Sequence, residues 1–184
     1  MKTLRMIMAL TAVVVLCVVL GSPSLALADR TLHVHLEGFQ EVPAVSTAGV
    51  GEFRAKINRD GSIAYELRYF GIEGDVQQAH IHFAQRGVNG RIVVFLCTNL
   101  GNGPAGTQAC PPSPGVVTGT IMAADVISPG PPPASQGIDA GEFDAFVETL
   151  LEGVAYVNVH STDFPGGEVR GQIRQHPHIF LRGF

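Results

Sequence analysis

Short runs in which apolar and polar residues alternate, separated by glycine-rich turns, constrain the fold of this chain more than any other feature. Residues 32–36, 49–57 and 63–69 alternate in this way, and an Asp60-Gly61 pair, typical of tight hairpins, joins the last two runs. Successive side chains of a strand point to opposite faces of a sheet, so each run can bury one row in a core. The pattern predicts an antiparallel, all-β protein.

The same signals predict five further strands. A phase shift in the 49–57 run indicates a bulge near Gly51. The 92–96 run is apolar on both faces, so we expect it to be covered on both sides. Many short strands joined by glycine-rich turns favour a β-sandwich or β-barrel. The further strands are expected at residues 79–83, 92–96, 116–122, 156–160 and 168–174.

One segment has the spacing of a helix instead. Asp139 is a suitable N-cap, and Glu142 lies three residues later, as in a capping box. Apolar residues then recur on one helical face, and Gly153 is placed to end the helix. We therefore expect one short helix between Asp139 and Glu152.

The first 28 residues have the composition of an export signal peptide. Lys2 and Arg5 precede a long apolar run, and residues 26–28 supply the small side chains of a cleavage site. The alternative is an uncleaved anchor, but the Gly-Ser-Pro-Ser break at 21–24 favours removal. We expect residues 29–184 to form a single domain that spans no membrane after cleavage. Its predicted location is outside the cell, in the periplasm or in the cell envelope.

Charge and cysteine content narrow the function further. The formal net charge is −4, and removal of the signal makes it more negative, so nucleic acid is not an expected partner. Cys17 is lost with the signal, which leaves Cys97 and Cys110. An even pair in an exported protein predicts a disulfide, although two thiols at this spacing could instead bind a metal.

Histidines in two of the expected strands share a strand phase. Ala79, Ile81 and Phe83 can face the core, which leaves His80 and His82 together on the outer face of the sheet. In the 156–160 run, Val157 and Val159 point inward while Asn158 and His160 point outward. If the two strands are neighbours, His80, His82 and His160 form a metal site for copper or zinc. Such a site should lose its metal as the pH falls through about 6.5, where free histidine becomes charged.

Other polar residues have weaker assignments. His33 and His35 form a second His-x-His that could extend the metal site or face solvent. The alternative for His80, His82 and His160 is a polar, solvent-facing side of the sheet that binds no metal. Asn158 could orient a neighbouring imidazole or make a cross-strand hydrogen bond. Glu168 and Arg170 alternate on one strand, which predicts an ion pair or a solvated edge. No nucleophile-elbow, P-loop or Rossmann motif occurs, so the sequence indicates no catalytic residues.

Several of these stretches together resemble the CHRD domain, a module named after chordin and found in exported bacterial proteins. The resemblance covers residues 32–174 and leaves a C-terminal tail at 175–184. Since chordin binds protein ligands, the resemblance implies an extracellular interaction or adhesion module. The motifs that carry it are His33-Val34-His35-Leu36, Glu41-Val42-Pro43-Ala44, Ala79-His80-Ile81-His82, Asn158-Val159-His160-Ser161 and Glu168-Val169-Arg170-Gly171-Gln172.

The pattern is also distantly similar to Cu,Zn superoxide dismutase. That resemblance implies an Ig-like Greek-key β-sandwich in which His80 and His82 match the His-x-His copper ligands and His160 matches a later ligand. No histidine lies between His82 and His160, so the bridging imidazole and the zinc ligands of that family have no counterparts. Three hypotheses follow: an exported copper-binding protein, a metal-free module that binds another extracytoplasmic protein, and a weak superoxide dismutase-like oxidoreductase.

Overall fold

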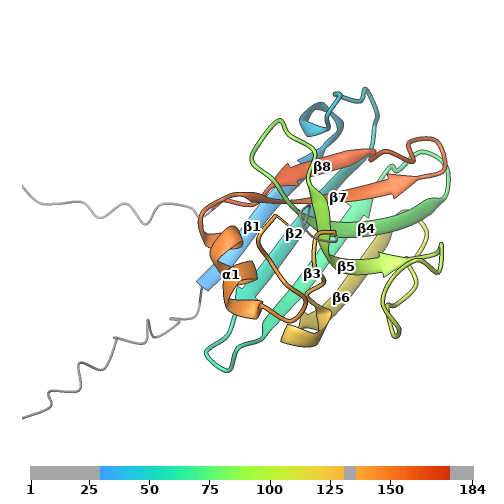
Figure 1. Ribbon diagram of the computed structural model, residues 1–184. Helices are drawn as coiled ribbons and strands as arrows, with labels where there is room; N and C mark the ends of the chain where they lie inside the picture. The colour runs from blue at the N-terminus through green and yellow to red at the C-terminus, as the bar shows by residue number, and fades with distance from the viewer. Residues whose placement is uncertain (1–29, 131–135, 175–184) are drawn as a thin grey trace, which may run out of the picture.

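A computed structural model describes residues 30–130 and 136–174, and within them the chain is all-β with one α-helix (Figure 1). The predicted signal peptide and C-terminal tail lie outside the described residues, as does part of the proline-rich loop near residue 131. The strands are β1 (Arg30–Glu37), β2 (Val50–Ile57), β3 (Ile63–Phe70), β4 (Val76–Phe83), β5 (Arg91–Thr98), β6 (Gly115–Ile121), β7 (Ala155–Ser161) and β8 (Val169–Gln172). Two short 3-10 helices, Gly38–Gln40 and Ala123–Asp125, follow β1 and β6, and α1 spans Phe143–Leu151.

The eight strands form one antiparallel sheet in the order β5-β4-β7-β8-β1-β2-β3-β6. Figure 1 shows the β4, β5, β7 and β8 half crossing over the β1, β2, β3 and β6 half. The side-chain amide of Gln108 donates to the carbonyls of Leu96 on β5 and Thr118 on β6, so the two ends of the sheet approach each other. The sheet is nearly closed, and the superoxide dismutase type of sandwich stays a prediction.

The apolar rows predicted by strand alternation form the core between the two halves. The rows of β1, β2 and β3 are buried, and β4 and β7 add alternate residues from the other half. The predicted bulge near Gly51 is wrong, because β2 pairs with both neighbours without a shift in register. Gly51 continues the inward row opposite Leu36, and Val50 lies on the exposed face. Register shifts occur in β4 instead, between Ala79 and His80 and between Ile81 and His82.

Helix α1 covers part of this core with Phe146, Val147 and Leu150, but it begins later than predicted. Asp139 is not its N-cap; Glu142 holds that position. Gly141 adopts a φ of +85°, which interrupts helical geometry before residue 142. The Glu142 carboxylate still accepts the Asp139 N–H at 2.7 Å, and Gly153, with a φ of +72°, follows the helix as predicted.

Two further features hold the β5 and β8 regions in place. The predicted disulfide between Cys97 and Cys110 is present and joins the end of β5 to the following loop. At the junction of the two halves, β8 pairs with β1 at Glu37 and Arg170, and a Cβ on Gly171 would lie 2.5 Å from the His35 carbonyl oxygen.

In the described part of the chain, no helix is both long and apolar enough to cross a bilayer.

Candidate metal centre

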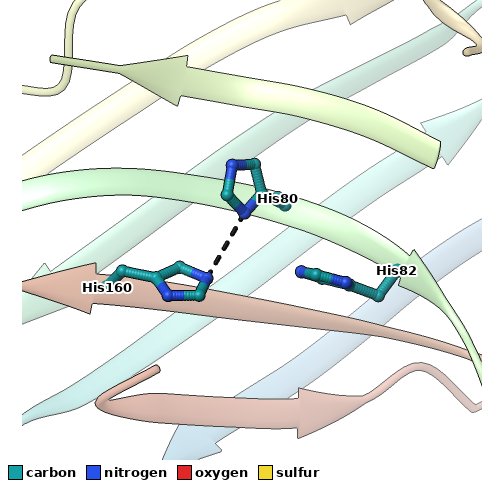
Figure 2. Close-up of side chains that lie close together, drawn as sticks. All are labelled: His80, His82 and His160. Atoms are coloured by element: carbon teal, nitrogen blue, oxygen red, sulfur yellow. Dashed lines mark hydrogen bonds between the residues drawn. The ribbon is translucent and has the colours of Figure 1, made fainter. Parts of the chain in front are cut away.

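His80, His82 and His160 come together on neighbouring strands, as the sequence predicts. Strands β4 and β7 are antiparallel neighbours, with His80 opposite Asn158 and His82 opposite Tyr156. Because cross-strand partners share a face of the sheet, these side chains and His160 lie on the same face. One ring nitrogen from each histidine lies within 4.8 Å of the other two. Figure 2 shows the three rings turned toward one another.

The face that carries the histidines points away from the apolar core but is not open to solvent. His80 is 0% exposed, His82 8% and His160 7%. The histidines therefore lie on the outer face of the sheet, and this face is covered by other segments of the chain. Three connecting segments contact this layer: the cover loop, defined as residues 84–90, the stretch after β1 that carries Glu41, and the turn after β7 that contains Pro165. A hydrogen bond from Asn89 Nδ2 to the Val42 carbonyl joins the first two segments at 2.7 Å.

Two of the three imidazoles have a fixed tautomer. His82 Nδ1 lies 3.1 Å from the Gly90 carbonyl, and His160 Nδ1 lies 2.9 Å from the Pro165 carbonyl. A carbonyl only accepts hydrogen bonds, so each Nδ1 carries the proton and each Nε2 keeps a lone pair. His82 Nε2 is buried and has no hydrogen-bond partner among the described residues. Backbone contacts on Nδ1 of this kind orient histidine ligands in metal sites.

The separation of His80 and His160 suits two ligands of one ion. His80 Nδ1 lies 3.3 Å from His160 Nε2. Metal–nitrogen bonds of about 2.0–2.1 Å in tetrahedral geometry place two ligand nitrogens about 3.3 Å apart. Without an ion, His80 donates its Nδ1 proton to His160, and ligation through Nδ1 requires the other neutral tautomer of His80. An inward movement of the His82 ring would complete a three-nitrogen site.

Burial keeps all three histidines neutral. Desolvation lowers the pKa of His80 to about 2, with smaller contributions from His160 and His82. Desolvation also lowers the pKa of His82 to about 4, and it lowers the pKa of His160. The charge change expected near pH 6.5 is thereby moved to more acidic solution. The folded protein offers neutral imidazoles across the physiological pH range, which is the form that binds metals.

Aromatic rings and a buried arginine line the histidine cluster. The Tyr156 ring stacks on His82 with centroids 4.7 Å apart, and the Phe95 ring meets His80 edge-on at 4.5 Å. Arg170 is buried, and its guanidinium lies over the Tyr156 ring. It donates to Asn89 Oδ1 at 3.1 Å and to the Val88 carbonyl at 2.9 Å, both in the cover loop.

The predicted ion pair or solvated edge at Glu168 and Arg170 is wrong. Both side chains are buried, and Arg170 contacts the cover loop as described above. Glu168 Oε1 accepts from the Thr47 hydroxyl at 2.7 Å and from the Glu73 N–H at 2.9 Å. The alternation of the two residues in sequence indicated a shared face but not the loops that cover it.

Asn158 and Glu41 extend this polar layer beside His82. Asn158 is buried next to His82 and Glu41, and its Oδ1 has no partner among the described residues. Burial raises the pKa of Glu41 to about 7, although Arg170, the Val42 N–H and Asn158 each favour its charged form. Glu41 was missed as a site residue, and its signal was its place in the Glu41-Val42-Pro43-Ala44 motif.

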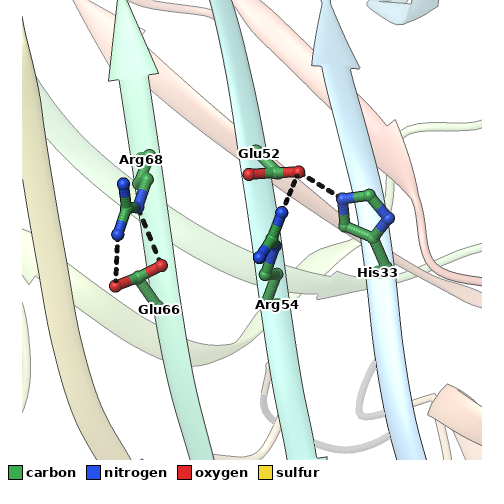
Figure 3. A network of polar contacts seen from close by, with 5 residues as sticks. All are labelled: His33, Glu52, Arg54, Glu66 and Arg68. Carbon is green, nitrogen blue, oxygen red and sulfur yellow. Dashed lines mark hydrogen bonds and ion pairs between the residues drawn. The ribbon is translucent and has the colours of Figure 1, made fainter.

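His33 and His35 are not part of the cluster. Both lie on the exposed face of β1, and His33 contacts the Glu52 carboxylate on β2. Arg54 donates to the same carboxylate at 2.9 Å, and Arg68 and Glu66 form a parallel pair on β3 at 2.8 Å (Figure 3). These contacts are a cross-strand hydrogen bond and two same-strand ion pairs on a solvated sheet face.

A family model agrees with this sequence and fold. The CHRD domain model matches residues 32–173, so the chain belongs to the CHRD domain family. Searches of curated proteins and of solved structures found no match. The similarity to Cu,Zn superoxide dismutase stays a prediction.

Proposed function

We propose that this CHRD domain protein is exported and binds one copper ion through His80, His82 and His160. The observation that carries the proposal is the convergence of three buried, neutral imidazoles, two of which are held by backbone carbonyls so that Nε2 keeps its lone pair. Zinc is the alternative ion, because imidazole ligands suit both metals. Copper is favoured because His80, His82 and His160 are distantly similar to the copper ligands of Cu,Zn superoxide dismutase.

The burial of these nitrogens also supports an ion. An unpaired polar atom in the interior costs free energy, and His82 Nε2 is such an atom. A bound ion would supply its missing partner.

Export is supported by the covalent structure. The Cys97–Cys110 disulfide fits an oxidising compartment, as does the signal-like composition of residues 1–28. N-terminal sequencing of the exported protein should begin at Asp29. We propose storage, delivery or surface redox chemistry of the metal outside the cytoplasm.

The alternative function is a metal-free interaction module. Membership of the CHRD family supports it, and so does Phe39, which is 73% exposed just after β1. A weak superoxide dismutase-like activity is the third proposal. Superoxide turnover by the copper-loaded protein would favour that activity, whereas a loaded protein without turnover would be a carrier.

A metal titration with elemental analysis and copper(II) spin resonance tests the main proposal. We expect one ion per chain with nitrogen ligands, lost in His80→Ala and His160→Ala and retained in the exposed control His35→Ala. A protein that binds no ion, or binding that survives both site substitutions, would leave the interaction module as the better function.

A further inference from the structure

We propose that the three-histidine site selects copper(I) over divalent copper and zinc. This inference rests on the proposed metal-binding function and names the oxidation state that the site takes. Three features of the described residues carry it: the donors are neutral, no carboxylate or thiolate lies among them, and the cluster contains three imidazoles rather than four.

The neutral donor set disfavours a doubly charged ion in a buried site. His80, His82 and His160 are neutral imidazoles, and the cluster that the structure brings together includes no carboxylate or thiolate. The cost of transferring an ion from water to a low-dielectric interior rises with the square of its charge. The transfer cost of a divalent ion is therefore about four times that of a monovalent ion of the same size. Anionic ligands normally offset this cost, and they are missing from this cluster.

The charged groups around the cluster do not replace such ligands. Arg170 places a buried positive charge on the Tyr156 ring, whose other face stacks on His82. Two carboxyls are buried near the cluster: Glu41, whose main charged neighbour is Arg170, and Glu168, which accepts hydrogen bonds from the Thr47 hydroxyl and the Glu73 N–H. Burial raises the pKa of Glu41 to about 7, which disfavours its charged form. Neither carboxyl belongs to the group of donor atoms that lie within 4.8 Å of one another, so a divalent ion there would have no anionic ligand.

The number of donors also favours copper(I). A zinc ion held by three histidines takes a water molecule as its fourth ligand, and copper(II) prefers tetragonal arrangements of nitrogen and oxygen donors. Copper(I) has a filled d shell, so it imposes no tetragonal geometry, and it accepts three ligands. On this face His80 and His82 contact the Phe95 and Tyr156 rings, and their polar neighbour Asn158 offers a neutral amide rather than a fourth imidazole or an anion. Cys97 and Cys110 are joined to each other and supply no thiolate.

Anaerobic competition titrations on the mature protein test the inference. Copper(I) would be titrated against bicinchoninate as the competing chelator, and copper(II) and zinc(II) against chelators of known affinity. We expect copper(I) to bind at least 100-fold more tightly than either divalent ion. The same three histidines should be required, so His82→Ala should abolish the copper(I) binding.

Asn158→Asp provides a matched test because it adds a carboxylate beside His82 with almost no change of shape. We expect it to reduce the preference for copper(I) by a factor of 10 or more, whereas Asn102→Asp, on the exposed disulfide loop, should leave it unchanged. Zinc or copper(II) binding that is as tight as copper(I) binding and is lost in His82→Ala would overturn this inference alone. A protein that binds none of the three ions would overturn the proposed function with it.

Discussion

The guanidinium carbon of Arg170 lies 3.4 Å from the centre of the Tyr156 ring. Strand β7 lies between β4 and β8, so His82 from β4 and Arg170 from β8 stack on opposite faces of this ring. Arg170 also donates to Asn89 and Val88, and the Tyr156 hydroxyl accepts the Gly90 N–H. The stack thereby fixes the His82 ring and the loop that covers it.

Replacement of Arg170 by lysine tests this arrangement. Lysine cannot reproduce the planar stack and both hydrogen bonds, so we expect the free energy of unfolding to fall by about 2–3 kcal/mol. Amide hydrogen exchange in the cover loop should accelerate. Arg54→Lys, on the exposed face of β2, is the control and should change stability by no more than about 0.5 kcal/mol. Unchanged exchange at residues 86–90 in Arg170→Lys would show that other contacts hold the loop.

The buried histidines should make the metal-free protein sensitive to acid. Their pKa values are lowered on folding, so the unfolded chain binds more protons below its histidine pKa of 6.5, and stability falls as the pH falls. Glu41 acts in the opposite direction between pH 4.5 and about 7, because folding raises its pKa. On unfolding, the three histidines each take up a proton and Glu41 releases one. The free energy of unfolding should therefore change by at most about 2.7 kcal/mol per pH unit between pH 6.5 and 4.5.

Urea unfolding at several pH values measures this slope. Glu41→Gln removes the opposing group, so we expect its slope to rise toward about 4.1 kcal/mol per pH unit. A stability that is flat or increases on acidification in this range would contradict the burial of three neutral imidazoles.

The disulfide should contribute through the unfolded chain. The bond joins residues 13 positions apart, and a loop of this size corresponds to about 3 kcal/mol in the loop-entropy model. We expect the double variant Cys97→Ser with Cys110→Ser to lose about this amount in urea unfolding. A reducing agent should destabilise the native protein to a similar extent and leave the double variant unaffected. Equal stability of the reduced and oxidised native protein would argue against this contribution.

Gly171→Ala should weaken the junction between β8 and β1. Its new Cβ would lie 2.5 Å from the His35 carbonyl oxygen and would also overlap Val34, so the strands must separate. We expect a loss of about 3 kcal/mol in the free energy of unfolding, as for overpacked sites. Gly166→Ala is the matched control, because nothing lies within 4 Å of a Cβ added there. Similar losses in the two variants would contradict the close approach of β8 to β1.

Local patterns predict much of this fold because alternation in a strand directly sets which side chains share a face. That rule placed His80, His82 and His160 together once β4 and β7 became neighbours, which the sequence suggested but could not prove. It also misplaced the bulge at Gly51, because an inward glycine looks like a break in an apolar row. The capping pattern at Asp139 predicts too early a helix start, because Gly141 interrupts helical geometry before residue 142.

The enclosure of the site was not predictable from strand patterns. It depends on the cover loop, whose position is set by Arg170 and Tyr156, residues about 70 to 80 positions later in the chain. Contacts of this range leave no periodic signal in the sequence. Glu41 escaped notice for the same reason, since its neighbours Asn158 and Arg170 belong to the last strands.

The pairing of β4 with β7 also sets when a metal could be captured. His80 and His160 are 80 residues apart in the chain, so closing that long loop is a slow and entropically costly step of folding. If the protein is exported as proposed, a chain that is still emerging from a translocation channel holds His80 and His82 but lacks their partner from β7. Metal capture would therefore come after transport, and the ion would be acquired from the compartment in which folding is completed.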